Sequence, residues 1–229
     1  MPGMYYNYVY LFGSAIRARE RSKSEAEVHP DIPTQSTLES VIMSVTAAEA
    51  FINELTAHLL REPLVFPDSS TYERSRMSRC AHFLQIVEEE RLSLLVKYNI
   101  VALCLTEKKF EKGRNPYQDF ANLISLRNHL VHFKSMDIFD RIQDGSSRFQ
   151  HEALIKALQQ KKLARKCQDG VVSSNLSLIQ TVEMAEWACN TSRNIIASVL
   201  DMIPLPTADQ GGMDPVYILR NLFENMRNV

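Results

Sequence analysis

The stretch from Asn115 to Lys134, NPYQDFANLISLRNHLVHFK, contains the residues of this chain best suited to chemistry. Arg127 carries a permanently charged guanidinium, which binds anions through a planar fork of donors. His132 carries an imidazole, which ordinarily titrates near neutral pH. Asn128 directly follows the arginine and can both donate and accept hydrogen bonds. A cluster of these residue types could bind an anion and transfer a proton.

A helix through this stretch would place Arg127 in the middle of an apolar stripe. Asn115 is a suitable N-cap, Pro116 suits the first turn, and an apolar repeat follows. The positions three and four residues on either side of the arginine are all apolar: Leu123, Ile124, Leu130 and Val131. An unpaired guanidinium there would be costly, so we expect Arg127 to face an acidic partner, a water-filled cleft or a bound anion. Asn128 and His132, four residues apart, would lie on the flank of the stripe.

A long helix is predicted from Ser36 to about Arg61, and it carries a candidate partner for the arginine. Ser36 and Glu39 have the spacing of a capping box, and an apolar repeat follows them. Glu49 lies at the edge of that apolar stripe. Two interpretations remain open: a half-buried carboxylate that pairs with a solvent-side cation, or the acidic partner of Arg127.

The remaining patterns also favour helices, so the predicted fold is all-α: a helical bundle of about five core helices with short accessory helices. We expect an N-terminal helix and linker in residues 1–35, one helical domain in 36–204, and a short C-terminal helix packed on that domain in 205–229. The other predicted helices are Tyr5–Arg21, Ser70–Arg91, Ser93–Leu105, His151–Lys166, Asn175–Ile203 and Asp214–Arg227.

The composition limits the function classes. With 229 residues, 45% of them apolar, the chain can bury a sizeable core. The formal net charge is −1, so no global positive field would attract nucleic acid, and any such binding must be local. No run of residues is long and apolar enough to suggest a membrane span, and no signal peptide is recognisable.

The cysteines favour a cytoplasmic protein. Cys80, Cys104, Cys167 and Cys189 lie far apart and show no C-x-x-C spacing. That pattern is typical of reduced thiols rather than of a disulfide framework or a zinc site. We predict no cofactor.

The segment RNHLVH, from Arg127 to His132, resembles the defining motif of the HEPN (higher eukaryote and prokaryote nucleotide-binding) superfamily of α-helical domains. That motif is an arginine, four to six residues and a histidine, often with a polar residue directly after the arginine. SVTAAEAFINEL, from Ser44 to Leu55, resembles the glutamate-bearing helix of many HEPN domains. The resemblance covers roughly Ser36 to Pro204.

This resemblance implies a metal-independent endoribonuclease that acts as a homodimer, with RNA as substrate and a shared cleft between the motifs. In such enzymes the ribose 2′-hydroxyl attacks the adjacent phosphate and leaves a cyclic phosphate. His132 would transfer the proton and Arg127 would stabilise the charged phosphorane. Asn128 would orient the imidazole or bind a phosphate oxygen, and Glu49 would hold Arg127. A toxin or defence effector, with an antitoxin or regulatory protein as partner, fits this chemistry.

Further polar residues could contact the substrate. Lys108, Lys109, Lys112 and Arg114 precede the motif and would supply phosphate contacts if they rim the cleft, although a solvated surface is the usual explanation for such a group. His129 forms H-x-x-H with His132, but no carboxylate or third histidine lies near enough in sequence to complete a metal site. We expect His129 to point to solvent or toward substrate.

A rival interpretation is a non-catalytic HEPN-like helical module that binds a nucleotide or a protein partner. In that case Arg127 and Glu49 would form a structural pair, and His132 would be a histidine that complements a helix C-terminus.

Overall fold

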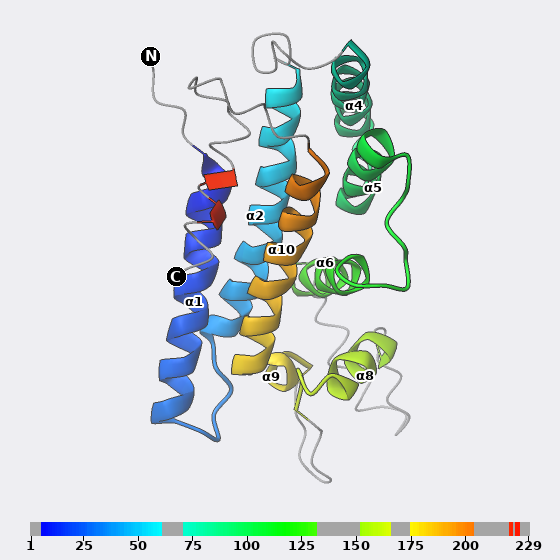
Figure 1. The fold of residues 1–229 in the computed structure, drawn as a ribbon. Helices are drawn as coiled ribbons and strands as arrows, with labels where there is room; N and C mark the ends of the chain where they lie inside the picture. The colour runs from blue at the N-terminus through cyan, green and yellow to red at the C-terminus, as the bar shows by residue number, and fades with distance from the viewer. Residues whose placement is uncertain are drawn as a thin grey trace. The chain divides into compact units, whose positions relative to one another are not determined.

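The computed structural model describes residues 6–60, 71–131, 152–165, 175–203, 220–221 and 223–224. Every regular element in these residues is an α-helix (Figure 1), which confirms the predicted all-α fold. None of the helices it describes is long and apolar enough to cross a membrane. The helices are α1 (Asn7–Val28), α2 (Ser36–Leu59), α4 (Thr71–Glu89), α5 (Leu94–Thr106), α6 (Tyr117–Val131), α8 (Glu152–Gln160), α9 (Asn175–Ile179) and α10 (Val182–Met202).

The chain forms two compact units whose boundaries fall within α1, α2, α6 and α10. Unit 1 comprises Met1–Gly13, Thr46–Gln118 and Arg193–Val229, and unit 2 comprises Ser14–Val45 and Asp119–Ser192.

In unit 1, α4 and α5 pack side by side as a helical hairpin (Figure 1). Two polar groups of α5 are buried against α2. The Tyr98 hydroxyl donates to the Ala48 carbonyl at 2.9 Å, and the Lys97 ammonium donates to Asn53 Oδ1 at 2.9 Å and pairs with Glu88. A buried polar group without a hydrogen-bond partner costs folding free energy, so these bonds determine the position of α5 on α2.

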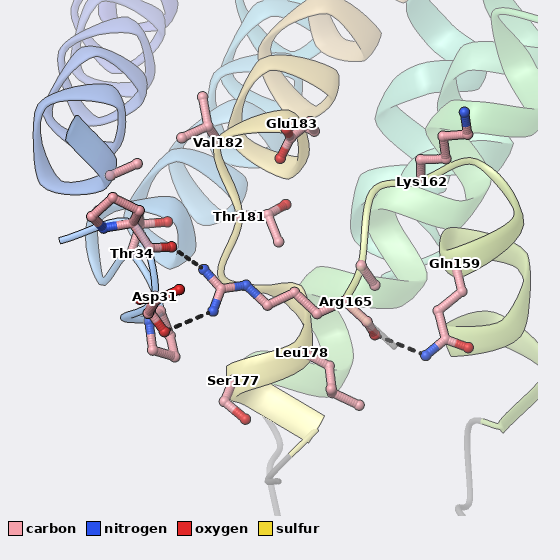
Figure 2. Close-up of a pocket in the computed structure, with 14 residues that line it drawn as sticks. Asp31, Thr34, Gln159, Lys162, Arg165, Ser177, Leu178, Thr181, Val182 and Glu183 are labelled. Atoms are coloured by element: carbon pink, nitrogen blue, oxygen red, sulfur yellow. Dashed lines mark hydrogen bonds between the residues drawn. The ribbon is translucent and has the colours of Figure 1, made fainter. Parts of the chain in front are cut away.

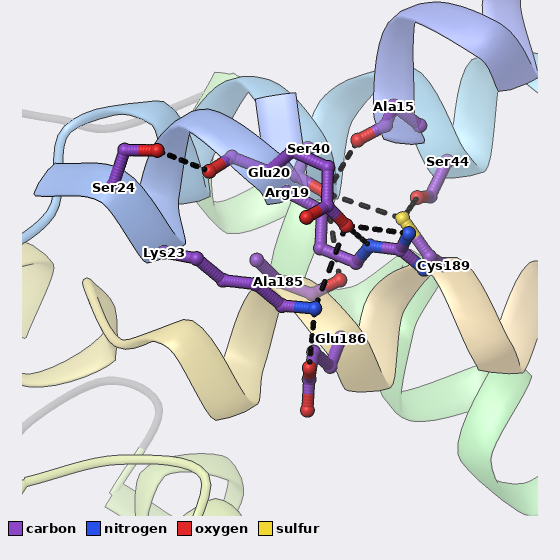
Figure 3. A network of polar contacts seen from close by, with 10 residues as sticks. All are labelled: Ala15, Arg19, Glu20, Lys23, Ser24, Ser40, Ser44, Ala185, Glu186 and Cys189. Carbon is purple, nitrogen blue, oxygen red and sulfur yellow. Dashed lines mark hydrogen bonds and ion pairs between the residues drawn. The ribbon is translucent and has the colours of Figure 1, made fainter. Parts of the chain in front are cut away.

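In unit 2, small polar side chains connect α1, α2 and α10. Ser40 Oγ lies 3.1 Å from the Ala15 carbonyl and 3.4 Å from the Ala185 carbonyl (Figure 3). Ser192 Oγ donates to the Ser44 carbonyl at 2.8 Å. All three serines are buried. Short side chains let the helix backbones approach closely, and their hydroxyls are satisfied by backbone carbonyls of the neighbouring helices.

The first helix is longer than predicted, because its polar tail bonds to α2. The expected end at Arg21 is wrong, and α1 continues to Val28. Ser22 Oγ lies 2.9 Å from Thr37 Oγ1, and Arg21 pairs with Glu39. These partners in α2 support the extra helical residues up to Val28.

The predicted capping box at the start of α2 is also wrong. The Ser36 hydroxyl donates to the Glu25 carboxylate, which also accepts the Ser36 backbone N–H at 3.2 Å, while Glu39 pairs with Arg21. The first turn of α2 is therefore capped by a carboxylate of α1, which also complements the positive end of the helix dipole.

The predicted long helix Asn175–Ile203 is divided in two by Thr181. Thr181 Oγ1 accepts the Met184 backbone N–H at 3.1 Å and donates to the Leu163 carbonyl at 2.8 Å. The Thr37 hydroxyl donates to the Thr181 carbonyl at 2.9 Å. These bonds make Thr181 the N-cap of α10 and stop the helix from continuing through it from α9.

Candidate functional site

Helix α6 positions the arginine of the motif. It begins at Tyr117, one residue later than Pro116, and Asp119 in its first turn pairs with Lys161. The face that carries Arg127 is anchored by residues with little or no exposure: Phe120, Leu123 and Ile124. The helical spacing predicted for this stretch is thus confirmed as far as Val131, where the description of this region ends.

Arg127 itself is half-buried. Its apolar surroundings are asymmetric, because Leu123 and Ile124 are buried whereas Leu130 is half-buried and Val131 is 53% exposed. The guanidinium therefore lies at the margin of the apolar face. In this position part of the charge is desolvated, which strengthens its interaction with an anion, and part remains accessible to a ligand.

Asn128 is exposed and lies beside the guanidinium. Its Oδ1 accepts a hydrogen bond from Arg127 Nη1 at 3.2 Å. This bond orients the arginine and leaves the Asn128 amide nitrogen as a donor close to the same surface.

The expectation that His129 points to solvent is wrong. His129 is buried, with only 8% exposure, on the side of α6 that also carries the fully buried Leu126 three residues earlier. Helix α6 is thus buried on two sides. The apolar stripe around Arg127 in the sequence indicated only one of these sides. We therefore leave His129 out of the proposed substrate contacts.

The other member of the motif, His132, lies outside the described residues. Its position relative to Arg127 thus stays a prediction.

Glu49 is half-buried in α2, as expected for the edge of a core stripe. It belongs to unit 1, whereas Arg127 belongs to unit 2, so the pairing of the two stays a prediction. Within unit 1, the Glu49 charge acts on the phenol of Tyr98. Burial, and to a smaller extent this carboxylate, raises the pKa of Tyr98 well above its ordinary value, so the tyrosine stays protonated.

The basic residues before α6 are all exposed: Lys108, Lys109, Lys112 and Arg114. Arg114 pairs with Glu111 at 2.8 Å, an exposed pair of the kind that contributes little to stability. The ring of Phe110 stacks on Tyr117 with centroids 5.5 Å apart, which ties this loop to the start of α6. The loop belongs to unit 1, so its predicted place at the rim of an Arg127 cleft stays a prediction.

Unit 2 contains a cavity of about 1030 Å³ that no sequence pattern indicated (Figure 2). It lies between the segment after α1, the end of α8 and the start of α10. Arg165 crosses it and donates to the carbonyls of Asp31 at 3.2 Å and Ile32 at 3.3 Å. Gln159 Nε2 donates to the Arg165 carbonyl at 2.9 Å. The cavity is large enough for a nucleotide. The Arg165 guanidinium inside it, however, is already bonded to backbone carbonyls.

The described residues include three cysteines and several groups that could bind a metal ion. Cys80, Cys104 and Cys189 are free thiols, whereas Cys167 lies outside the described residues. In the part of the chain that the structure describes, no three His, Cys, Asp or Glu side chains are grouped so that they could hold a metal ion.

Comparisons with protein-family models, with curated proteins and with solved structures found no match to this chain.

Proposed function

We propose that this chain is a metal-independent endoribonuclease of the HEPN type, which acts on RNA as a homodimer. The observation that carries the proposal is the half-buried Arg127 with Asn128 bonded to it, five residues before His132 on an α-helical scaffold. A toxin or defence role, controlled by a partner protein, fits an enzyme of this kind. The cysteine spacing, typical of reduced thiols, favours the cytoplasm as its place of action.

The proposed reaction is an intramolecular attack within the RNA. The 2′-oxygen forms a bond to the adjacent phosphorus, the bond from phosphorus to the 5′-oxygen breaks, and the products are a 2′,3′-cyclic phosphate and a 5′-hydroxyl. Arg127 would neutralise the negative charge that builds on the phosphoryl oxygens, because its planar fork fits them. His132 would transfer the proton to or from a reacting oxygen. Asn128 would hold Arg127 in register and donate to a phosphate oxygen.

The decisive experiment is digestion of a mixed RNA pool by the purified full chain in excess EDTA. We expect cleavage to continue without divalent metal, because the side chains of His132 and Arg127 would transfer the proton and stabilise the charged phosphorane. End-group analysis should find 2′,3′-cyclic phosphates. Cleavage that stops in EDTA, or that leaves 5′-phosphates, would instead indicate a metal-dependent nuclease and would refute the proposal.

A helical module that binds a nucleotide or a protein is the second candidate, and the cavity of unit 2 favours it. Arg127→Gln separates the two functions. If Arg127 acts on the scissile phosphate, cleavage should fall by about 10²–10³-fold with little change in melting temperature, because the residue is only half-buried.

A structural pair between Arg127 and Glu49 predicts the opposite result. The melting temperature would then fall strongly, both in Arg127→Gln and in Glu49→Gln, because each variant would leave an uncompensated charge. Arg17→Gln is the matched control, since Arg17 is an exposed arginine in unit 2 whose side chain, among the described residues, bonds to Ser14 of its own helix. Initial rates on a fluorescent RNA and thermal melting followed by circular dichroism measure both quantities.

A further inference from the structure

The α4–α5 hairpin of unit 1 brings together two cysteines that are 24 positions apart. Cys80 in α4 and Cys104 in α5 are equally far in sequence from Leu92, which lies in the turn between the helices. Because both helices rise by about 1.5 Å per residue, the two cysteines lie at the same height along the hairpin. Arg76 lies one turn before Cys80 on the same side of α4, and its Nε donates to the Cys104 carbonyl, so Cys80 and Cys104 are neighbours across the hairpin.

The two sulfurs have different access to solvent. Cys80 is fully buried, whereas Cys104 is partly exposed. Cys104 also lines a pocket of about 230 Å³ between α4 and the end of α5, large enough for a small reactant. A reagent that enters the pocket thus meets Cys104, whereas the buried Cys80 does not line the pocket.

Two arginines of α4 line the same pocket. Arg76 Nε donates to the Cys104 carbonyl at 3.0 Å, and the same guanidinium donates to the Leu105 carbonyl, so it is fixed beside the last turn of α5. Arg79 is exposed, and its Nε donates to the Ser75 carbonyl at 3.3 Å. Glu107 supplies a carboxylate to the pocket, so two positive charges face one negative charge.

These surroundings give the two thiols different pKa values. The neighbouring Cys80 thiol, helped by the charges of Arg79 and Arg76, lowers the pKa of Cys104 to about 7. The neighbouring Cys104 sulfur and burial raise the pKa of Cys80. Near neutral pH the accessible sulfur is therefore substantially a thiolate, the nucleophilic form, while the buried sulfur keeps its proton.

We propose that Cys104 and Cys80 form an oxidation site for hydroperoxides, in which Cys104 reacts first and Cys80 then closes an intramolecular disulfide. The Cys104 thiolate attacks the terminal peroxide oxygen, the O–O bond breaks, and hydroxide or an alkoxide leaves and takes a proton from water, as the sulfur becomes a sulfenic acid. The Cys80 sulfur then attacks the sulfenic sulfur, its proton passes to the departing hydroxyl group, and water is released. The peroxide gains the two electrons that the pair of thiols loses.

The thiol chemistry of this site does not involve the residues of the proposed ribonuclease. Its test therefore does not depend on RNA cleavage. The full chain, with Cys167→Ser and Cys189→Ser to leave only the pair, is treated with hydrogen peroxide at pH 7. We expect both remaining thiols to disappear together and to return with dithiothreitol. Peptide mapping without reductant should find the Cys80 and Cys104 peptides joined.

Single substitutions test the order of the two steps. Cys80→Ser should stop at the sulfenic acid, which dimedone traps on Cys104, whereas Cys104→Ser should leave Cys80 unlabelled because that thiol is buried and protonated. The proposal is overturned if wild-type peptides stay unlinked after treatment, or if Cys80 is the residue that dimedone labels. Peptide mapping of the wild-type protein after peroxide treatment tests the proposal even if a variant does not fold.

The role of the arginine has its own readout. Arg79→Gln should raise the apparent pKa in the pH profile of Cys104 alkylation by iodoacetamide and slow the reaction at pH 7 by roughly twofold or more. Arg79→Lys should restore the profile. Arg91→Gln, at an exposed arginine in the turn of the same hairpin, is the control. An unchanged profile in Arg79→Gln would remove Arg79 from the site.

Discussion

His132→Ala is expected to lower the rate of RNA cleavage by about 10²–10⁴-fold, the usual range for the loss of a general acid or base. Alanine can neither accept nor donate the proton, whereas the electrostatic contribution of Arg127 would persist in the variant. The residual activity should therefore lose its dependence on pH near neutrality, because the titrating group has gone.

His82→Ala is the matched control, because His82 is an exposed histidine of α4 outside the proposed machinery. Its cleavage rate should equal that of the wild type. Equal rates for His132→Ala and His82→Ala would remove the histidine from the mechanism and leave the binding module as the better explanation. Rates are measured at saturating RNA from pH 5.5 to 8.5 in EDTA, with circular dichroism to verify the fold of each variant.

Phe120→Ala is expected to destabilise the protein by roughly 3–5 kcal/mol, the usual cost of removing a buried aromatic side chain and leaving a cavity. Phe120 is fully buried near the start of α6, on the face that carries Arg127. A loss of this size is a large fraction of the total stability of most domains. Cleavage should fall in parallel with the folded fraction, because α6 positions the proposed site.

Val131→Ala, in the last residue of the same helix, provides the comparison. Val131 is 53% exposed, so its truncation should change the free energy of unfolding by no more than about 0.5 kcal/mol. Urea unfolding followed by circular dichroism measures both variants. A loss below about 1 kcal/mol for Phe120→Ala would mean that the ring is not an anchor of α6 and that Arg127 is held by other contacts.

The helices were largely readable from the sequence because helix formation depends on local spacing. Apolar residues at helical spacing predicted α2, α5 and α6, and a capping signal predicted α4, with ends displaced by only a few residues. The same spacing placed Arg127 on an apolar face, and Leu123 and Ile124 are buried there as expected. Of the proposed site, residue types and spacing alone identified Arg127, Asn128 and His132.

The tertiary structure determined the partners of these side chains, because a pattern along one helix does not reveal which neighbour covers that helix. Ser36 bonds to Glu25 of α1 and not within its own first turn. His129 is buried because α6 is covered on a second side.

Two further features also depended on contacts between distant segments. Thr181 stops a continuous helical pattern through hydrogen bonds to residues far away in the chain. Cys80 and Cys104 form a pair only because the turn at Leu92 folds α5 back onto α4. Equal distance from a predicted turn was the one signal in the sequence that pointed to this pair. Local spacing thus determined the helices and named the candidate chemistry, whereas packing decided which groups are buried, which are bonded and which can react.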